Sequence, residues 1–169
     1  MAPRIKLPVI LFGEGKSEQG YGRWLNRLAG TLDVPVAIRA EKLCGGDPLE
    51  LVSSSLKKLK AIEQTRGRYS HKALLLDTDL KGQNPERDQQ AENTAREKGL
   101  HLIWQDPDHE SFLRQHFPVG KAKLEDVWPA YEKGLDALQY EKVLTRDHLN
   151  RARAIDPGLN DFLVAIGWD

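Results

Sequence analysis

Residues 6–15 read KLPVILFGEG, a short apolar run that stops at two glycines on either side of a glutamate. An apolar run of this length, bounded by glycine, predicts a buried strand that ends in a turn. A helix is predicted to follow, with Ser17 as its N-cap and Gly30 at its end. Its inner face is marked by apolar side chains at helical spacing: Tyr21, Trp24, Leu25 and Leu28. The chain therefore opens with a strand and a helix.

The same alternation continues for about a hundred residues. Asp47 followed by Pro48 is a favoured helix start, and a polar, helix-prone segment follows at 86–98. Three further strands are predicted, within residues 34–43, 73–76 and 100–104. Alternating strands and helices predict an α/β fold, a three-layer Rossmann-like parallel sheet of about four strands with helices on both faces.

The chain turns helical after the fourth predicted strand. Its 169 residues give room for one domain with one core. We expect a core at about 5–117 and a helical C-terminal extension at about 118–169. Four helices are predicted in this part of the chain, at 108–117, 124–138, 145–154 and 159–166.

Composition excludes several classes of protein. The 25 basic and 25 acidic residues cancel, which argues against simple polycationic coating of nucleic acid. The longest apolar stretch, residues 9–12, is far below the ~20 residues of a membrane span, so no membrane partner is expected. A single cysteine, Cys44, excludes an internal disulfide framework and a multi-cysteine zinc site. We expect a cytoplasmic protein.

Acidic residues follow three of the predicted strands. Parallel strands end at one edge of the sheet, so these carboxylates are expected to meet there. A hard divalent cation, Mg²⁺ or Mn²⁺, would neutralise their repulsion. Asp77 and Asp79 would point the same way if the third strand continued through both. The strand-end acids are Glu14, Asp77, Asp79, Asp106, Asp108 and Glu110.

Acids at strand ends also cap helices, and Asp79 or Asp108 fits that role equally. Two nucleotide-binding motifs are incomplete in this chain. Lys16 and Ser17 end like a phosphate-binding loop, but Ile10 stands where that loop needs its first glycine. The dinucleotide-binding pattern also fails, because its last glycine is missing.

Several segments, in order, resemble one family. Residues 14–18 (EGKSE) resemble the EGxTE opening of Toprim-fold proteins, and residues 74–79 (LLLDTD) resemble the Toprim DxD. Residues 106–117 (DPDHESFLRQHF) resemble a segment of the RloB-like branch. The resemblance spans about residues 9–134, with a downstream Tyr-x-Lys element carried by Trp128, Tyr131 and Lys133.

The resemblance implies a metal-dependent site. Asp77 and Asp79 would hold Mg²⁺, and Glu14 would be a third carboxylate, as metal ligand or general acid/base. In the nuclease branches Glu18 and a later acid, here Glu110, complete the site. Metal ions supply what phosphodiester cleavage needs, an activated water and neutralised charge on the phosphate.

Four further side chains are candidates for contact with the substrate. Lys81 or Lys133 would stabilise the phosphate or leaving group, and a solvated surface is the alternative for both. His116 matches a histidine of the family segment and is a candidate substrate contact, with a core position as the alternative. His109 faces the same two alternatives, and it replaces the usual aromatic residue before Glu110.

The implied function is a Mg²⁺-dependent nuclease, a hydrolase of ester bonds in DNA or RNA. The resemblance also implies a role in prokaryotic antiviral defence, together with an ATPase partner. One alternative is a non-catalytic binding or regulatory subunit that uses the helical extension. Another is a different DxD metal enzyme, a phosphatase or glycosyltransferase acting on phosphate esters or nucleotides. The sequence leaves open DNA against RNA, and whether the chain forms a homo-oligomer.

Overall fold

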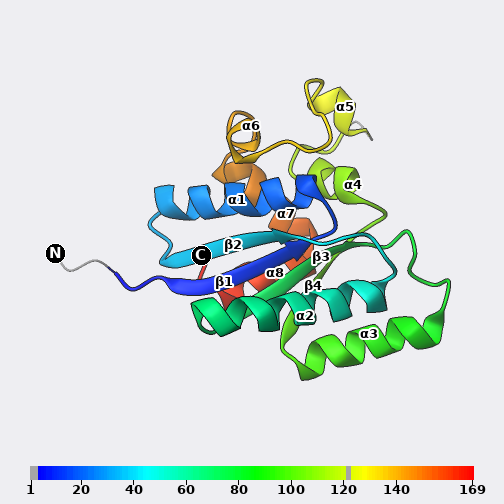
Figure 1. The fold of residues 1–169 in the computed structure, drawn as a ribbon. Helices are drawn as coiled ribbons and strands as arrows, with labels where there is room; N and C mark the ends of the chain where they lie inside the picture. The colour runs from blue at the N-terminus through cyan, green and yellow to red at the C-terminus, as the bar shows by residue number, and fades with distance from the viewer. Residues whose placement is uncertain (1–3, 121–122) are drawn as a thin grey trace.

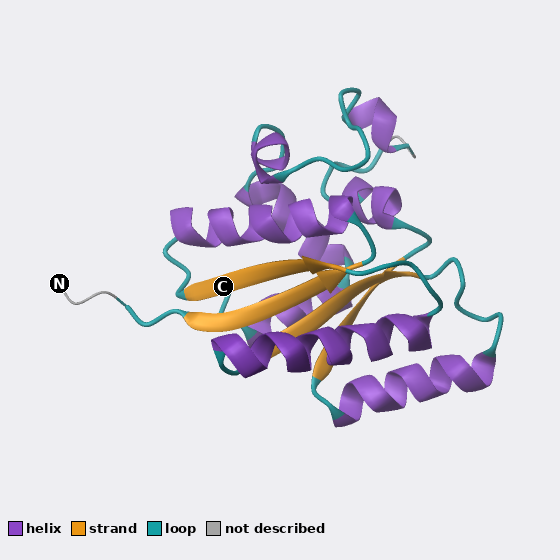
Figure 2. Ribbon diagram, viewed as in Figure 1, coloured by secondary structure: helices purple, strands orange, loops and turns teal. Residues whose placement is uncertain are grey.

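The sheet at the centre of the molecule has four strands, all parallel (Figures 1 and 2). The computed structural model describes residues 4–120 and 123–169. The strand order is β2-β1-β3-β4, which confirms the predicted α/β class and its three-layer Rossmann-like arrangement. The strands are β1 (Leu7–Gly13), β2 (Val36–Lys42), β3 (His71–Asp77) and β4 (Leu100–Gln105).

Three long helices connect the strands: α1 (Lys16–Thr31), α2 (Pro48–Arg66) and α3 (Pro85–Glu97). The predicted start of α2 is confirmed, since the Asp47 side chain accepts a hydrogen bond from Glu50 N over 2.9 Å. The predicted N-cap of α1 is wrong. The helix begins after Gly15, and the Ser17 hydroxyl instead accepts a hydrogen bond from Gly134 N over 2.8 Å.

Both faces of the sheet are buried, as expected of parallel strands. Side chains along β1 alternate between two cores. Val9 and Leu11 pack on the side of α1, whereas Ile10 and Phe12 pack against α2 and α3. This alternation decides which side chains at the strand ends face α1.

The chain after β4 forms short helices joined by loops: α4 (His109–Arg114), α5 (Leu124–Val127), α6 (Ala137–Glu141), α7 (Arg146–Ile155) and α8 (Pro157–Ala165). The single helix predicted over 124–138 is wrong. Pro129 lacks an N–H and restricts the residue before it, and Gly134 has a φ of +83°. These two residues keep α5 and α6 apart.

The C-terminal extension shares the core on the α1 face. Leu149, Phe162 and Trp168 are buried in the same cluster as Tyr21 and Trp24 of α1. Figure 1 shows α6 next to α1, with which it is in contact, and α8 contacts β4. The extension is therefore continuous with the hydrophobic core of the sheet.

Candidate metal centre

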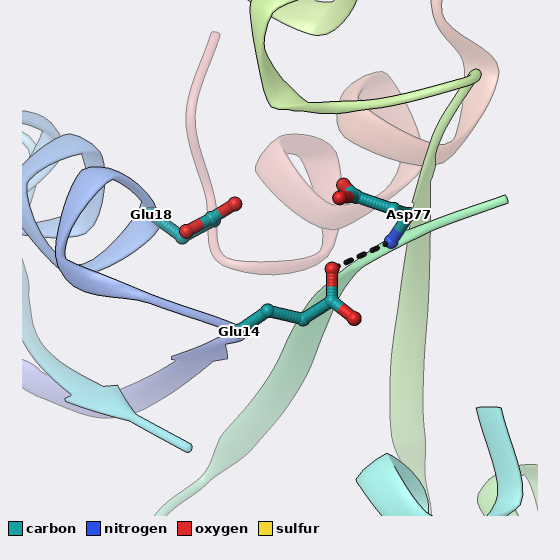
Figure 3. Close-up of side chains that lie close together, drawn as sticks. All are labelled: Glu14, Glu18 and Asp77. Carbon is teal, nitrogen blue, oxygen red and sulfur yellow. Dashed lines mark hydrogen bonds between the residues drawn. The ribbon is translucent and has the colours of Figure 1, made fainter. Parts of the chain in front are cut away.

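Three carboxylates converge at the carboxyl edge of the sheet (Figure 3). Glu14 lies in the turn after β1, Glu18 in the first turn of α1, and Asp77 at the end of β3. One carboxylate oxygen of each residue lies within 4.8 Å of those of the other two. Of the strand-end acids predicted to meet, Glu14 and Asp77 lie together in this cluster, and Glu18, which the resemblance implied, joins them.

A glycine turn makes the approach of Glu18 possible. A Cβ at Gly13 would lie 2.2 Å from the Cβ of Glu18, so a side chain there would push α1 away from β1. Gly15 N donates a hydrogen bond to Glu18 Oε2 over 3.0 Å. This bond fixes one oxygen of a carboxylate that is only 7% exposed.

Asp77 is held by hydrogen bonds with the turn after β1 and with strand β4. Alternation along β3 puts Asp77 on the face of Ala73 and Leu75, toward α1. Its backbone N donates to Glu14 Oε2 over 3.2 Å. Its register partner on β4, the fully buried Gln105, donates from Nε2 to Asp77 Oδ1 over 2.8 Å.

The close negative charges of the three carboxylates favour the binding of a proton or a cation. Burial, with the adjacent Glu14 carboxylate, raises the pKa of Asp77 to about 8. The pKa of Glu14 is also raised, chiefly by burial. Close carboxylates either share protons or bind a cation, and an all-oxygen donor set suits a hard divalent ion. The three residues therefore fit Mg²⁺ or Mn²⁺ by donor type and by spacing.

A cavity of about 460 Å³ opens onto the carboxylates. Besides Glu14, Glu18 and Asp77, its walls include the half-buried Glu110 and the exposed Lys133. A second cavity, of about 530 Å³, is lined by these same two residues and by residues of α4, of α5 and of the loops beside them. Glu110 and Lys133 thus lie where the two cavities meet.

Asp79 is not among the three residues of the cluster, and its predicted role as a ligand beside Asp77 stays a prediction. Strand β3 ends at Asp77, so the two side chains do not share a face as they would in a continued strand. Asp79 is exposed, and its Oδ1 accepts a hydrogen bond from Leu80 N over 2.9 Å. Asp108 takes the alternative role of a cap, accepting from Ser111 N over 2.9 Å at the start of α4.

Two other predicted site residues are not among those that line either cavity. Lys81 Nζ lies 4.2 Å from the ring centroid of Trp104 and 3.7 Å from Glu92 Oε1. His116 is fully buried, with its Nε2 2.8 Å from the Tyr21 hydroxyl. Burial lowers the pKa of His116 to about 3, so the ring is neutral at pH 7. The structure places His116 in the core, which was the alternative position for it.

Sequence reasoning missed a polar network behind Asp77. From Gln105 it runs to His109, with His109 Nδ1 2.6 Å from Gln105 Oε1, and on to Tyr140, whose hydroxyl lies 3.0 Å from His109 Nε2. The Tyr140 hydroxyl also lies 2.8 Å from Ser17 O, near the start of α1. Gln105 at the end of a strand and His109 four residues later were the available signal, whereas Tyr140 had none.

Comparison of the chain with models of protein families, with curated proteins and with solved structures found no match. Among the residues that the structure describes, no helix combines the length and apolar character needed to cross a membrane.

Proposed function

We propose that this protein is a divalent-metal-dependent phosphodiesterase that cleaves DNA or RNA. The observation that carries the proposal is the meeting of Glu14, Glu18 and Asp77 at the carboxyl edge of the sheet. Ligand sites in open α/β sheets form at this edge. The resemblance of residues 14–18 and 106–117 to RloB-like Toprim proteins supplies the substrate class.

The three carboxylates would hold Mg²⁺ or Mn²⁺, which supplies Lewis acidity and an activated water when bound. Lys133, on the wall of the same cavity, binds the phosphate through its ammonium group. Glu110, which lines both cavities, is placed to hold or move a proton at its carboxylate. These roles require substrate to enter the cavity beside Asp77.

The proposed setting is prokaryotic antiviral defence with an ATPase partner, on the strength of the RloB-like resemblance. The net charge of zero supports a subunit that relies on a partner to engage nucleic acid. Tight DNA binding by the isolated chain at physiological salt would contradict this dependence.

The two alternatives differ in what they require of the acids. A DxD phosphatase or glycosyltransferase uses both acids of the motif together, as the Toprim resemblance also implies, so the position of Asp79 does not separate this alternative from the nuclease. A non-catalytic binding subunit requires no metal chemistry at Asp77. Metal binding and cleavage therefore distinguish the nuclease from the binding subunit.

The first experiment is Mn²⁺ titration by calorimetry on the full chain, followed by a cleavage assay on single- and double-stranded DNA and RNA. Asp77→Asn is the test variant, and its amide oxygen can still accept from Gln105. Asp79→Asn is the matched control, two residues away and outside the cluster. We expect Asp77→Asn to abolish Mn²⁺ binding and cleavage and Asp79→Asn to retain both.

Three results would contradict the proposal. Wild-type protein that binds no Mn²⁺ at millimolar concentration removes the metal site. Equal loss in the two variants would contradict the ligand set of Glu14, Glu18 and Asp77, because it would add Asp79 to the ligands. Metal binding without cleavage of any substrate, with and without an ATPase encoded beside the chain, favours the binding subunit.

A further inference from the structure

Two buried tyrosine–histidine pairs lie side by side in the core on the α1 face. Tyr140 pairs with His109 and Tyr21 pairs with His116, over 3.0 and 2.8 Å. All four residues are at most 3% exposed. The rings of Tyr21 and Tyr140 pack edge to face, with their centroids 6.0 Å apart. The pairs therefore share chemistry, burial and surroundings.

The pairs differ in what lies beyond the histidine. His109 continues through Gln105 to Asp77 Oδ1, over contacts of 2.6 and 2.8 Å. His116 Nδ1 instead lies 3.2 Å from Phe112 O, within its own turn of chain. Of the two pairs, the one with His109 is joined to the carboxylate cluster.

We propose that Gln105 is a positioning residue of the metal site, and that Tyr140 acts through His109 to hold it. The inference rests on the proposed metal site and extends it to the C-terminal extension. Gln105 touches no solvent, so its amide can adopt only the orientations that its neighbours allow. With Nε2 donating to Asp77, its Oε1 faces His109 Nδ1.

The ring of His109 has a polar neighbour at both nitrogens. An amide oxygen can only accept, so Nδ1 carries the hydrogen in this arrangement and Nε2 faces the Tyr140 hydroxyl. The Tyr140 hydroxyl has a single hydrogen, which the two acceptors His109 Nε2 and Ser17 O share, so the network also reaches the start of the helix that carries Glu18. Groups one step behind metal ligands set their orientation, and their loss typically costs roughly 10- to 100-fold in metal affinity.

The test compares three variants of the full chain by Mn²⁺ calorimetry. Gln105→Met keeps the side-chain length and removes both hydrogen bonds. Tyr140→Phe removes one hydroxyl, which reaches Asp77 only through His109 and Gln105. Tyr21→Phe is the matched control, because it removes the hydroxyl of the pair that does not reach Asp77. Thermal unfolding in EDTA measures the structural cost of each change.

We expect the Kd for Mn²⁺ to rise roughly 10- to 100-fold in Gln105→Met and about 3- to 10-fold in Tyr140→Phe. Tyr21→Phe should stay within about 2-fold of wild type while losing as much thermal stability as Tyr140→Phe. The two tyrosine variants would then lose equal thermal stability but unequal affinity for Mn²⁺. A purely structural role of Tyr140 does not predict this difference.

The opposite results are equally distinct. If wild type binds Mn²⁺ and Asp77→Asn does not, yet Gln105→Met and Tyr140→Phe bind like wild type, the positioning role is overturned and the metal site stands. If the two tyrosine variants lose affinity in parallel, the effect is structural and the positioning role is again overturned. If wild type binds no Mn²⁺, the site and the inference fall together.

Discussion

Glu14 accepts a hydrogen bond from the backbone N–H of Asp77, although 63 residues separate them in the chain. The bond joins the turn after β1 to the end of the neighbouring strand β3. It also brings the carboxylates of the two residues together in a half-buried place. This pairing makes the stability of the metal-free protein depend on pH.

Metal-free wild type should lose stability as the pH rises from about 4 to about 8, relative to Asp77→Asn. The pKa of Asp77 is about 8 in the folded protein, against an ordinary value of 3.8. The stabilisation by its bound proton is therefore complete below pH 3.8 and is lost as the pH rises toward 8. Urea unfolding of both proteins across this range in EDTA measures the difference.

The difference between the two proteins isolates the interacting carboxyl pair of Glu14 and Asp77. His109 and His116 are buried and neutral, with pKa values lowered to about 3, and they destabilise both proteins alike in acid. A constant difference from about pH 4 to about pH 8 would show that Asp77 ionises normally in the fold.

Mn²⁺ should raise the melting temperature of wild type and leave Asp77→Asn unchanged. Binding to the folded state alone stabilises by about 2.7 kcal/mol at about 100 times the Kd. For a chain of this size that corresponds to a shift of roughly 5–10 °C. Scanning calorimetry with and without metal measures it, and EDTA should reverse the shift. An equal shift in Asp77→Asn would place the ion elsewhere.

Gly20→Ala should destabilise the protein by about 2–3 kcal/mol. A Cβ at Gly20 would lie 2.0 Å from Leu135 O, a backbone atom that cannot turn aside, so α1 and the segment before α6 would separate. Gly30→Ala is the control in the same helix, since nothing lies within 4 Å of its Cβ position. It should gain about 0.5–1 kcal/mol from helix propensity. Urea unfolding measures the change in the free energy of unfolding for both variants. Equal changes would contradict the close approach of Gly20 to Leu135 O.

Lys133→Gln should lower the kcat/KM of cleavage about 10-fold or more, and Lys81→Gln should change it little. Both side chains are exposed lysines, but of the two, Lys133 alone lines the cavity at the carboxylates. The Lys81 ammonium group lies over the ring of Trp104 and forms an ion pair with Glu92. A larger loss in Lys81→Gln would move the phosphate contact to the loop after β3.

The sheet and its first helices were predictable from local signals. Apolar runs stopped by glycine or aspartate located the strands, and Asp47 with Pro48 located the start of α2. The helix predicted over 124–138 failed because Pro129 lies within that range. In the structure the missing N–H prevails, and the segment is held by tertiary contacts such as the burial of Trp128.

Strand topology made only the strand-end part of the candidate site predictable. Glu14 and Asp77 follow from the shared edge of parallel strands, and Glu18 came from the family resemblance. The predicted place of Asp79 beside Asp77 depended on β3 continuing past Asp77, where the strand ends. Tyr140 lies 123 residues from Ser17, and no spacing along the chain indicates that their contact exists.

The position of Tyr140 in the chain has a consequence for biosynthesis. A ribosome releases residues in order, and N-terminal segments begin to fold first. A nascent chain that has emerged as far as β4 already carries Glu14, Glu18 and Asp77, but not the tyrosine that holds Gln105 through His109. We therefore expect the carboxylates to reach their final geometry only after Tyr140 has emerged, so that a shorter nascent chain carries the ligands without the finished site.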